Sequence, residues 1–514
     1  METSNSLATA QLDAPLDFTP KFTVSLPIVM RNHRYRLPCT LESPFSIEIA
    51  AISDVIPDDT SDATERAMAK IEWQERVEEG YPSLVQALAD SGACWTRIEL
   101  KWRQIQPEPP PAPYSDYDLG WFDERLQLIA DAGIQIIAVV HDAPYWAAEE
   151  STGPIYPEQV PAFAQFLTDM VGRYKQSPYN IHHWQLWNEP DQTEKLPYWP
   201  GGYGFDGDLY ADMLAHAYPA IKAVDPGATV LMGGIAYDFF EEYGDGPFNR
   251  YFPDDVMDAG GGSYMDATSF HYFPDFYREW ERWNIYGPPT CGDVHDGLGD
   301  PYFAGGIDLV AKTSHFYNRM RVCAGVDKPI WITEMGQHGR EGDLDSLGQQ
   351  ANYVLQGYAR ALAMGVKNIT WFVLVSPWYD AHQQGLLYED DWSPKPAFFT
   401  YQTMVYELTD YRYSRTLDVP KVEGYAFRND LGQEQVVAWS WGEELESGSL
   451  TFAPANVLRV VDREGQVTYI QDGGWRDADD ITGSVTIRLP AVPVDPDPTD
   501  DIRNTAEPLI ISKW

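Results

Sequence analysis

Two glutamate residues, Glu189 and Glu334, each end a short run of aromatic and aliphatic residues. Residues 183–188 precede Glu189, and residues 329–333 precede Glu334. Such runs are typical of buried β-strands, and Pro190 must end the first one because proline donates no ladder hydrogen bond. Two carboxyl groups that face each other can split a glycosidic bond, since one protonates the leaving oxygen while the other attacks carbon or activates water.

The environment of each carboxyl group must differ for this chemistry to work. The acid must be protonated at rest, so nearby apolar rings should raise its pKa. Trp184 and Trp187 are the nearest rings in the sequence, and strand alternation turns only one of them inward. The nucleophile must stay ionised and needs donors, for which Arg97 and Tyr272 are the candidates.

Each of these residues also has an ordinary structural interpretation. A single glutamate is usually a solvated surface charge, but two that each end a buried strand favour a functional site. Arg97 could pair with Glu99, although an arginine inside a barrel strand is costly without a purpose. Tyr272 could be a core aromatic residue with a satisfied hydroxyl group, and its position directly after His271 favours the site.

Further binding candidates follow other predicted strands. His141 could hold a sugar hydroxyl group or support Arg97, and an ordinary buried histidine is an equal alternative. Trp146 and Trp378 are candidate platforms for a sugar ring, whose C–H faces are apolar. For Trp378 the alternative is an aromatic residue that caps the barrel. The sequence indicates no metal ligand set, so we predict neither a metal nor a cofactor.

Helices and strands alternate over the region that carries these residues. Apolar residues from Phe163 to Tyr174 recur at the spacing of one helix face, and comparable patterns precede most of the apolar runs. The eight predicted strands cover residues 45–52, 95–100, 134–140, 183–189, 229–232, 266–271, 330–333 and 369–374.

This alternation predicts the α/β class and a (β/α)8 TIM barrel, which carries its chemistry at the carboxyl ends of its strands. Glu189 and Glu334 then end strands four and seven, on opposite sides of one mouth. A doubly wound sheet is the alternative, but no glycine-rich phosphate loop follows any predicted strand.

The pattern changes after about residue 411. Short alternating runs such as residues 422–427 and 435–441 are separated by turn signals, which predicts an all-β sandwich-like module. We therefore divide the chain into an extended N-terminal segment (residues 1–44), a catalytic barrel (45–410) and an accessory domain with a tail (411–514).

The composition limits the possible partners. The chain has 514 residues, of which 78 are acidic and 36 basic, so its net charge is −42. Such a charge argues against nucleic acid and against an anionic membrane surface, and no apolar run is long enough to span a membrane. We expect a carbohydrate as the partner, and the oligomeric state stays open.

The four cysteines and the first residues bear on location. Cys94 and Cys323 lie where predicted helices lead into strands and are interpreted as small buried hydrophobic residues, whereas Cys39 and Cys291 lie in loops where a disulfide is possible. The N-terminus has no signal-peptide pattern, so we expect an extracellular protein whose leader has been removed, with a cytoplasmic protein as the alternative.

The motifs resemble those of a known group of enzymes. Residues 187–190 (Trp-Asn-Glu-Pro) and 331–334 (Trp-Ile-Thr-Glu) are similar to the signature of the clan A retaining glycoside hydrolases, and residues 269–272 (Ser-Phe-His-Tyr) with Arg97 fit the same clan. Barrel and β module together look most like family 39, which includes β-xylosidases, or family 5.

The resemblance implies specific roles. Glu189 would be the acid/base, Glu334 the nucleophile, and Asn188 would bind the sugar 2-hydroxyl group. We therefore expect a retaining hydrolase that cleaves β-glycosidic bonds in neutral poly- or oligosaccharides by double displacement, of the β-xylosidase or endo-glycanase type. A non-catalytic carbohydrate-binding barrel is the alternative. A third possibility is a barrel enzyme that hydrolyses another type of bond. The sequence contains no serine nucleophile elbow and no metal triad that would support it.

Overall fold

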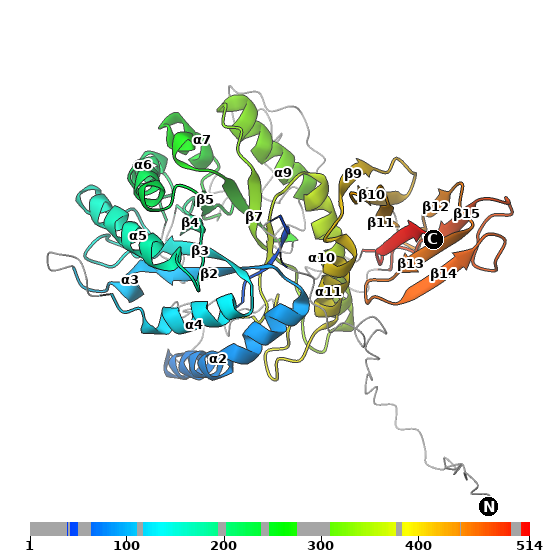
Figure 1. Cartoon of the computed structure of the whole chain (residues 1–514), viewed down its shortest axis with the longest axis horizontal. Helices are drawn as coiled ribbons and strands as arrows, with labels where there is room; N and C mark the ends of the chain where they lie inside the picture. Colours follow the sequence, from blue (N-terminus) through cyan, green and yellow to red (C-terminus); the bar gives the residue numbers. More distant parts are fainter. Residues whose placement is uncertain are drawn as a thin grey trace, which may run out of the picture.

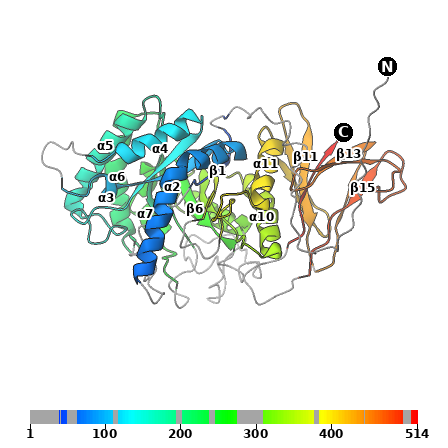
Figure 2. The same cartoon turned by 90° about the horizontal axis from the view of Figure 1, so that it is seen from below.

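The computed structural model describes residues 39, 42–49, 63–109, 117–193, 202–237, 246–274, 309–376, 383–442, 444–494 and 505–514. Most of the predicted extended segment at residues 1–44 therefore lies outside the described residues. Figures 1 and 2 show an α/β barrel beside a smaller β-rich part that contains the C-terminus.

Eight parallel strands form the barrel, which confirms the predicted fold class. The strands are β1 (Phe45–Ile47), β2 (Trp95–Lys101), β3 (Gln135–His141), β4 (His183–Asn188), β5 (Thr229–Gly234), β6 (Thr268–Tyr272), β7 (Ile330–Met335) and β8 (Ile369–Trp371). Strands from β5 down to β1 pair in turn, and β1 continues to β8, β7 and β6. Hydrogen bonds from Met232 N to Ala267 O (3.0 Å) and from His271 N to Ile235 O (2.8 Å) join β5 to β6.

Helices surround this barrel (Figure 1). They are α2 (Ala63–Ser91), α3 (Trp102–Ile105), α4 (Gly120–Asp131), α5 (Val160–Tyr174), α6 (Gly207–Val224), α7 (Phe252–Asp258), α9 (Leu309–Asn318), α10 (Leu344–Ala363) and α11 (Pro396–Leu408), with the short turns η1 (Pro157–Gln159), η3 (Gly261–Tyr264) and η6 (Arg319–Cys323). The helix predicted from its apolar face between Phe163 and Tyr174 is α5, and that face is buried in the core.

Aromatic rings fill the amino-terminal end of the barrel. Trp95 and His183 are the first residues of β2 and β4, and Trp331 is the second residue of β7. The His183 ring centre lies 4.7 Å from that of Trp95 and 5.7 Å from that of Trp331. Stacked inward layers of this kind fill a barrel, so chemistry is confined to the opposite mouth.

Antiparallel strands form the C-terminal part. They are β9 (Arg412–Thr416), β10 (Val422–Arg428), β11 (Glu434–Ser440), β12 (Ser449–Phe452), β13 (Val457–Val461), β14 (Val467–Gln471), β15 (Val485–Arg488) and β16 (Leu509–Lys513). Six form one sheet in the order β14-β13-β16-β11-β10-β9, and β12 pairs with β15 in a second. Leu450 and Ile487 of the small sheet share a hydrophobic cluster with Leu458 and Ile511 of the large one.

The other face of the large sheet packs on the barrel helices. Phe427 and Trp439 belong to the same hydrophobic core as the barrel. Two buried ion pairs cross this boundary: Arg360 of α10 binds Glu423 (2.7 and 2.8 Å), and Arg459 binds Glu407 of α11 (2.8 and 2.6 Å). The division at residue 411 stays a prediction, since one continuous core joins the two parts.

The interpretation of Cys94 as merely a small buried hydrophobic residue needs correction. Cys94 is buried, but it forms a disulfide with Cys39 across 55 residues of sequence. Cys323 is disulfide-bonded as well, which corrects its interpretation in the same way. The Cys39–Cys94 bond ties the approach to β1 to the start of β2.

Among the described residues, no helix combines the length and the apolar character needed to cross a membrane.

The packing around His183 makes stability depend on pH. Burial lowers the pKa of His183 to about 4. The neighbouring His182 also lowers this pKa, whereas Asp225 acts in the opposite direction. As the pH falls below the ordinary value of about 6.5, the unfolded chain binds a proton that the folded chain does not, so stability is lost between pH 6.5 and 4. Urea unfolding followed by tryptophan fluorescence measures the free energy of unfolding. Between pH 7 and pH 4, this free energy should fall by about 3 kcal/mol more in the wild type than in His183→Gln. Equal losses in both proteins would contradict this account.

Candidate active site

Strand β4 ends in an irregular turn. This turn places the side chains of Asn188 and Glu189 at the mouth of the barrel. Trp187 and Glu189 have positive φ angles of 80° and 42°, which are rare for residues other than glycine and are found where a site needs strain. The Trp187 ring points away from the mouth and packs at 6.1 Å from Phe163 and 5.3 Å from Tyr203. Trp184 is also buried in the core around the barrel.

Arg97 of β2 connects three other strands at the mouth. Its side chain is fully buried, and its Nη1 atom lies 2.7 Å from Glu334 Oε1 on β7 and 2.7 Å from Glu48 Oε2 just after β1. Its Nη2 donates to Asn188 Oδ1 at the end of β4, and its Nε donates to Gln185 Oε1 at 3.3 Å. The predicted contact between Arg97 and Glu334 therefore exists, whereas the alternative partner Glu99 lies farther along the strand.

These contacts set the charges of the buried groups. Burial alone would lower the pKa of Arg97, but Glu334 and Glu48 outweigh it, so the pKa is raised and the guanidinium stays charged. Burial also raises the pKa of Glu334 to about 7. His271 and Arg97 lower this pKa, whereas the negative charges of Glu48 and Glu189 raise it. Glu334 is thus closer to neutrality than we expected for a nucleophile.

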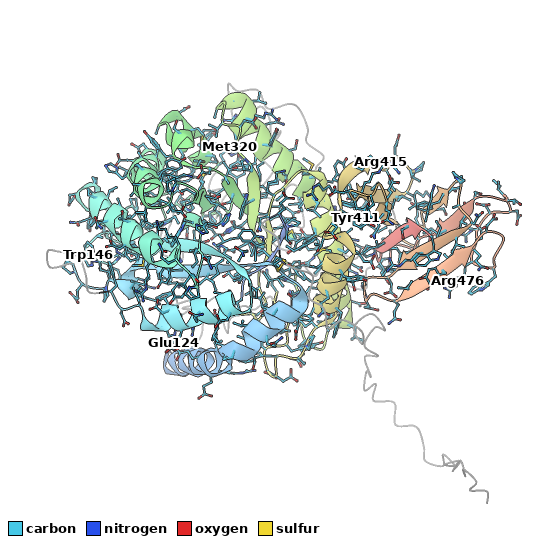
Figure 3. All side chains as sticks on the ribbon, viewed as in Figure 1. Glu124, Trp146, Met320, Tyr411, Arg415 and Arg476 are labelled. Carbon is cyan, nitrogen blue, oxygen red and sulfur yellow. A yellow bond between two sulfur atoms is a disulfide. The ribbon has the colours of Figure 1, made fainter. Side chains whose placement is uncertain are left out.

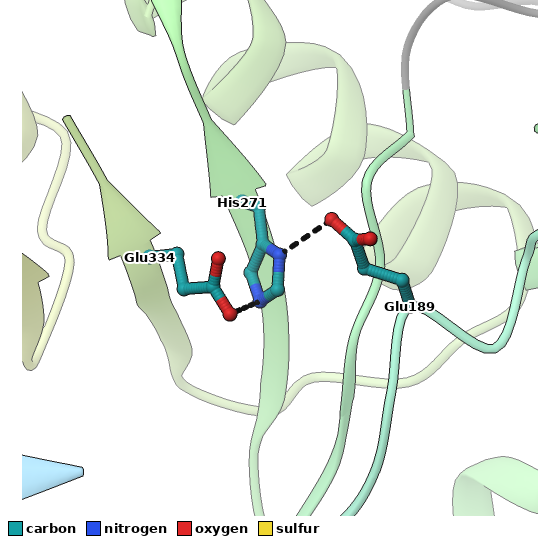
Figure 4. Close-up of side chains that lie close together, drawn as sticks. All are labelled: Glu189, His271 and Glu334. Atoms are coloured by element: carbon teal, nitrogen blue, oxygen red, sulfur yellow. Dashed lines mark hydrogen bonds and ion pairs between the residues drawn. The ribbon is translucent and has the colours of Figure 1, made fainter. Parts of the chain in front are cut away.

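His271 lies between the two candidate carboxyl groups, as Figure 4 shows. Its Nδ1 is 3.0 Å from Glu189 Oε1, and its Nε2 is 3.5 Å from Glu334 Oε1. Burial lowers the pKa of His271 to about 3, and the positive charges of Arg97 and Lys312 add to this effect. The ring is therefore neutral at ordinary pH and carries one proton that can face either carboxyl group.

Small and buried groups hold His271 in this position. A Cβ atom on Gly234 of β5 would overlap with His271 Nε2 and with Thr333 Oγ1, so this position requires glycine. On the other side, the buried Lys312 of α9 donates to the carbonyl oxygens of His271 (2.8 Å) and Ala236 (2.6 Å). The ends of β5 and β6 are thereby fixed relative to each other.

Asn188 is oriented by the same arginine. Because its Oδ1 accepts from Arg97, its amide NH2 group must point the other way. Asn188 is only partly buried, so this donor can serve a ligand in the mouth.

His141 belongs to a charged cluster beside the site. Its Nδ1 lies 3.0 Å from Asp142, and its Nε2 lies 3.4 Å from Glu99. Burial opposes the charged form, but Asp142 and Glu99 outweigh it and raise the pKa of His141 to about 9. Lys101, 3.4 Å from Glu99, and His141 together lower the pKa of Glu99 to about 2. His141 thus supports Arg97 indirectly, through its interaction with neighbouring carboxylates such as Glu99.

Three aromatic residues were also predicted to line the site. Tyr272 lies in the hydrophobic core, and Lys312 is 5.8 Å from its ring centre, so its ring is on the helix side of β6 while His271 faces the mouth. His271 Nε2 lies 3.5 Å from Glu334, and the role of Tyr272 as a second donor stays a prediction. The ring of Trp146, labelled in Figure 3, packs against Trp102 of α3 at 5.2 Å. Trp378 lies outside the described residues.

Oxygen or nitrogen atoms of Glu189, His271 and Glu334 lie within 4.8 Å of one another, a set that could hold a metal ion. However, Glu189 approaches Nδ1 and Glu334 approaches Nε2, which are opposite edges of one ring. A single metal ion bound to Nδ1 or to Nε2 of His271 would therefore be close to only one of the two carboxyl groups on these edges. The geometry suits proton exchange between the three groups better than metal binding.

Sequence reasoning missed Glu48, Gln185 and Lys312. Glu48 directly follows the short strand β1, so the strand-end pattern that identified Glu189 and Glu334 could have found it. Gln185 lies two residues from His183 on the inward face of β4, where alternation places it. No sequence signal pointed to Lys312, whose position depends on how α9 packs.

Comparison with known families agrees with this geometry. Residues 58–373 match the model of the cellulase family, glycosyl hydrolase family 5, and this match includes both Glu189 and Glu334. The chain belongs to glycosyl hydrolase family 5, and the predicted clan A resemblance is confirmed.

The individual relatives are distant. The β-galactosidase Bga of Halorubrum lacusprofundi is 23% identical over 306 residues, which is 49% of this chain and 42% of the relative's length. A family 39 glycoside hydrolase from Bacteroides cellulosilyticus WH2 is 19% identical with a TM-score of 0.60, covering 92% of this chain and 81% of that one. A family 39 enzyme from Xanthomonas axonopodis pv. citri is 14% identical with a TM-score of 0.54, covering 91% and 93%. These structures share the fold.

The close fit at Gly234 gives a direct test of the role of His271. Gly234→Ala should push the imidazole out of line and lower kcat on any hydrolysed glycoside about 10-fold to 100-fold, because overpacking a filled site costs about 1–3 kcal/mol. Gly172→Ala on α5 is the matched control, since its added Cβ would meet only Val224 at 3.8 Å. If Gly234→Ala kept full activity, His271 would not need this position.

Proposed function

We propose that this chain is a retaining glycoside hydrolase that cleaves β-linked neutral sugars through a covalent glycosyl-enzyme. The observation that carries the proposal is the pair Glu189 and Glu334, which come from β4 and β7 and have carboxylate oxygens within 4.8 Å of each other. Retaining enzymes need about 5–5.5 Å between their carboxyl groups, whereas inverting enzymes leave about 6.5–9.5 Å for a water molecule.

The neighbours of each carboxyl group support the assignment of roles. Arg97 places a fixed positive charge beside Glu334 and favours its ionised form once substrate has excluded water. If the neutral His271 directs its Nε2 proton to Glu334, its Nδ1 accepts a hydrogen bond from the protonated carboxyl group of Glu189. This arrangement leaves the nucleophile ionised and the acid protonated at the start of the reaction.

The reaction then follows from these positions. Glu334 attacks the anomeric carbon while Glu189 protonates the departing oxygen, so the glycosidic bond breaks and a glycosyl ester forms. Glu189, now ionised, removes a proton from water, which displaces Glu334 and releases the sugar. Asn188 donates to the hydroxyl group next to the reacting carbon, and the charged cluster around His141 supplies further hydroxyl contacts.

The charge of the whole chain supports a neutral substrate. Arg97, Lys101 and His141 pair with the acidic side chains at the mouth, so the site itself is nearly balanced. The net charge of −42 disfavours a polyanionic sugar chain. Trp146 and Trp378 remain proposed platforms for sugar rings.

The disulfides support an extracellular location. Cys39–Cys94 and the bond to Cys323 persist in an oxidising environment and are rare in the cytosol. We therefore propose an extracellular location.

A panel of nitrophenyl β-glycosides (galactoside, glucoside, xyloside, mannoside and arabinoside) tests the function. The wild type should release nitrophenol from at least one of them, and Glu334→Gln should release it at least about 10³-fold more slowly. Equal rates in the two proteins, including no release from either, would support a carbohydrate-binding protein without catalysis.

The leaving group separates the acid from the nucleophile. Glu189→Gln should lower kcat/KM about 10²-fold to 10⁴-fold on a methylumbelliferyl glycoside, because general acid catalysis is lost. On a dinitrophenyl glycoside, which needs little protonation, formation of the glycosyl-enzyme should slow far less, and azide should restore turnover. A loss that is independent of the leaving group would contradict the assignment of Glu189 as the acid.

A further inference from the structure

Glu48 is a third carboxylate of the site for which the double displacement has no use. It directly follows β1, and its side chain is buried. Its backbone is fixed on both sides, since Glu48 N donates to Trp371 O (3.0 Å) and Leu374 N donates to Glu48 O (2.8 Å). A carboxylate held this rigidly away from water requires a partner.

That partner is the same nitrogen atom that serves Glu334. Arg97 Nη1 lies 2.7 Å from Glu48 Oε2 and 2.7 Å from Glu334 Oε1, so one N–H group points to each carboxylate. One positive charge therefore serves two acidic groups, while Arg97 Nη2 and Nε are occupied by Asn188 and Gln185. Any charge on Glu48 competes directly with the charge on Glu334.

We propose that Glu48 is a positioning residue that divides the charge of Arg97 between two carboxylates and thereby sets the pH at which Glu334 becomes ionised. This inference rests on the proposed role of Glu334 as the nucleophile. Glu48 acts through Arg97 and need not touch the substrate.

The other charged groups around the pair do not replace this effect. Glu334 faces Arg97 from β2, His271 from β6 and Glu189 from the turn after β4. Glu48 faces Arg97 and lies near Glu99 and His141, which carry opposite charges and are themselves paired. Burial raises the pKa of both Glu48 and Glu334, and the negative charge of Glu48 raises the pKa of Glu334 further. Because both groups share Arg97, their protons are lost in linked steps.

Removing the charge of Glu48 should make Glu334 easier to ionise. In Glu48→Gln the amide oxygen can still accept from Arg97, but the guanidinium charge is left to Glu334 alone. The acid limb of kcat/KM should move to lower pH than in the wild type by about one unit, a typical effect of one neighbouring charge. Glu48→Asn, which is shorter and also uncharged, should move it in the same direction.

The control removes a negative charge far from the mouth. Glu124 is exposed on α4, where Figure 3 labels it, and Glu124→Gln should leave the acid limb unchanged. If the acid limbs of Glu48→Gln and Glu48→Asn both coincide with that of the wild type while their melting temperatures fall, Glu48 is structural only and the proposal is wrong.

A second measurement does not depend on turnover. Carbon-13 NMR of protein labelled at the glutamate carboxyl carbons can follow Glu334 directly, since its signal is the one that Glu334→Gln removes. The midpoint of this signal should be lower in Glu48→Gln than in the wild type, and equal midpoints would overturn the proposal. If no glycoside is cleaved but the midpoint moves, the proposed function fails while the charge sharing stands.

Discussion

The structure of the mouth depends on one buried positive charge. Arg97 is fully enclosed, and its donors reach side chains on or beside β1, β4 and β7. Removing it would leave Glu48 and Glu334 buried without a cation, which typically costs several kcal/mol. The strands around the mouth must therefore be positioned so that their side chains contact the guanidinium group. These contacts fix the distances between residues that are far apart in the sequence.

The proton chemistry depends on a second constraint, the space beside β5. Gly234 leaves room for the His271 ring, and Lys312 holds the backbone of that histidine from the opposite side. A neutral imidazole then connects the two carboxyl groups, one of which has a charged neighbour in Arg97. The asymmetry between Glu189 and Glu334 thus comes from position, since the two side chains are chemically identical.

Much of this could be predicted because strand ends follow a simple pattern. Long apolar strands identified Glu189 and Glu334, and an arginine on an inward position of β2 identified Arg97. Glu48 was missed because the first strand was predicted to run to residue 52, which placed its end beyond Glu48, whereas β1 ends at Ile47. Tyr272 was assigned to the mouth because it directly follows His271 at a strand end, although successive side chains of a strand face opposite sides. The disulfide of Cys94 was missed because its partner lies 55 residues away and only the fold brings them together.

Double displacement by Glu189 and Glu334 determines the stereochemistry of the product, which can be measured directly. Proton NMR of a nitrophenyl β-glycoside during the first minutes of hydrolysis distinguishes the two anomers before they interconvert. The account predicts that the first sugar released is the β-anomer, followed by slow formation of the α-anomer. Release of the α-anomer first would show inversion, and would contradict a covalent intermediate on Glu334.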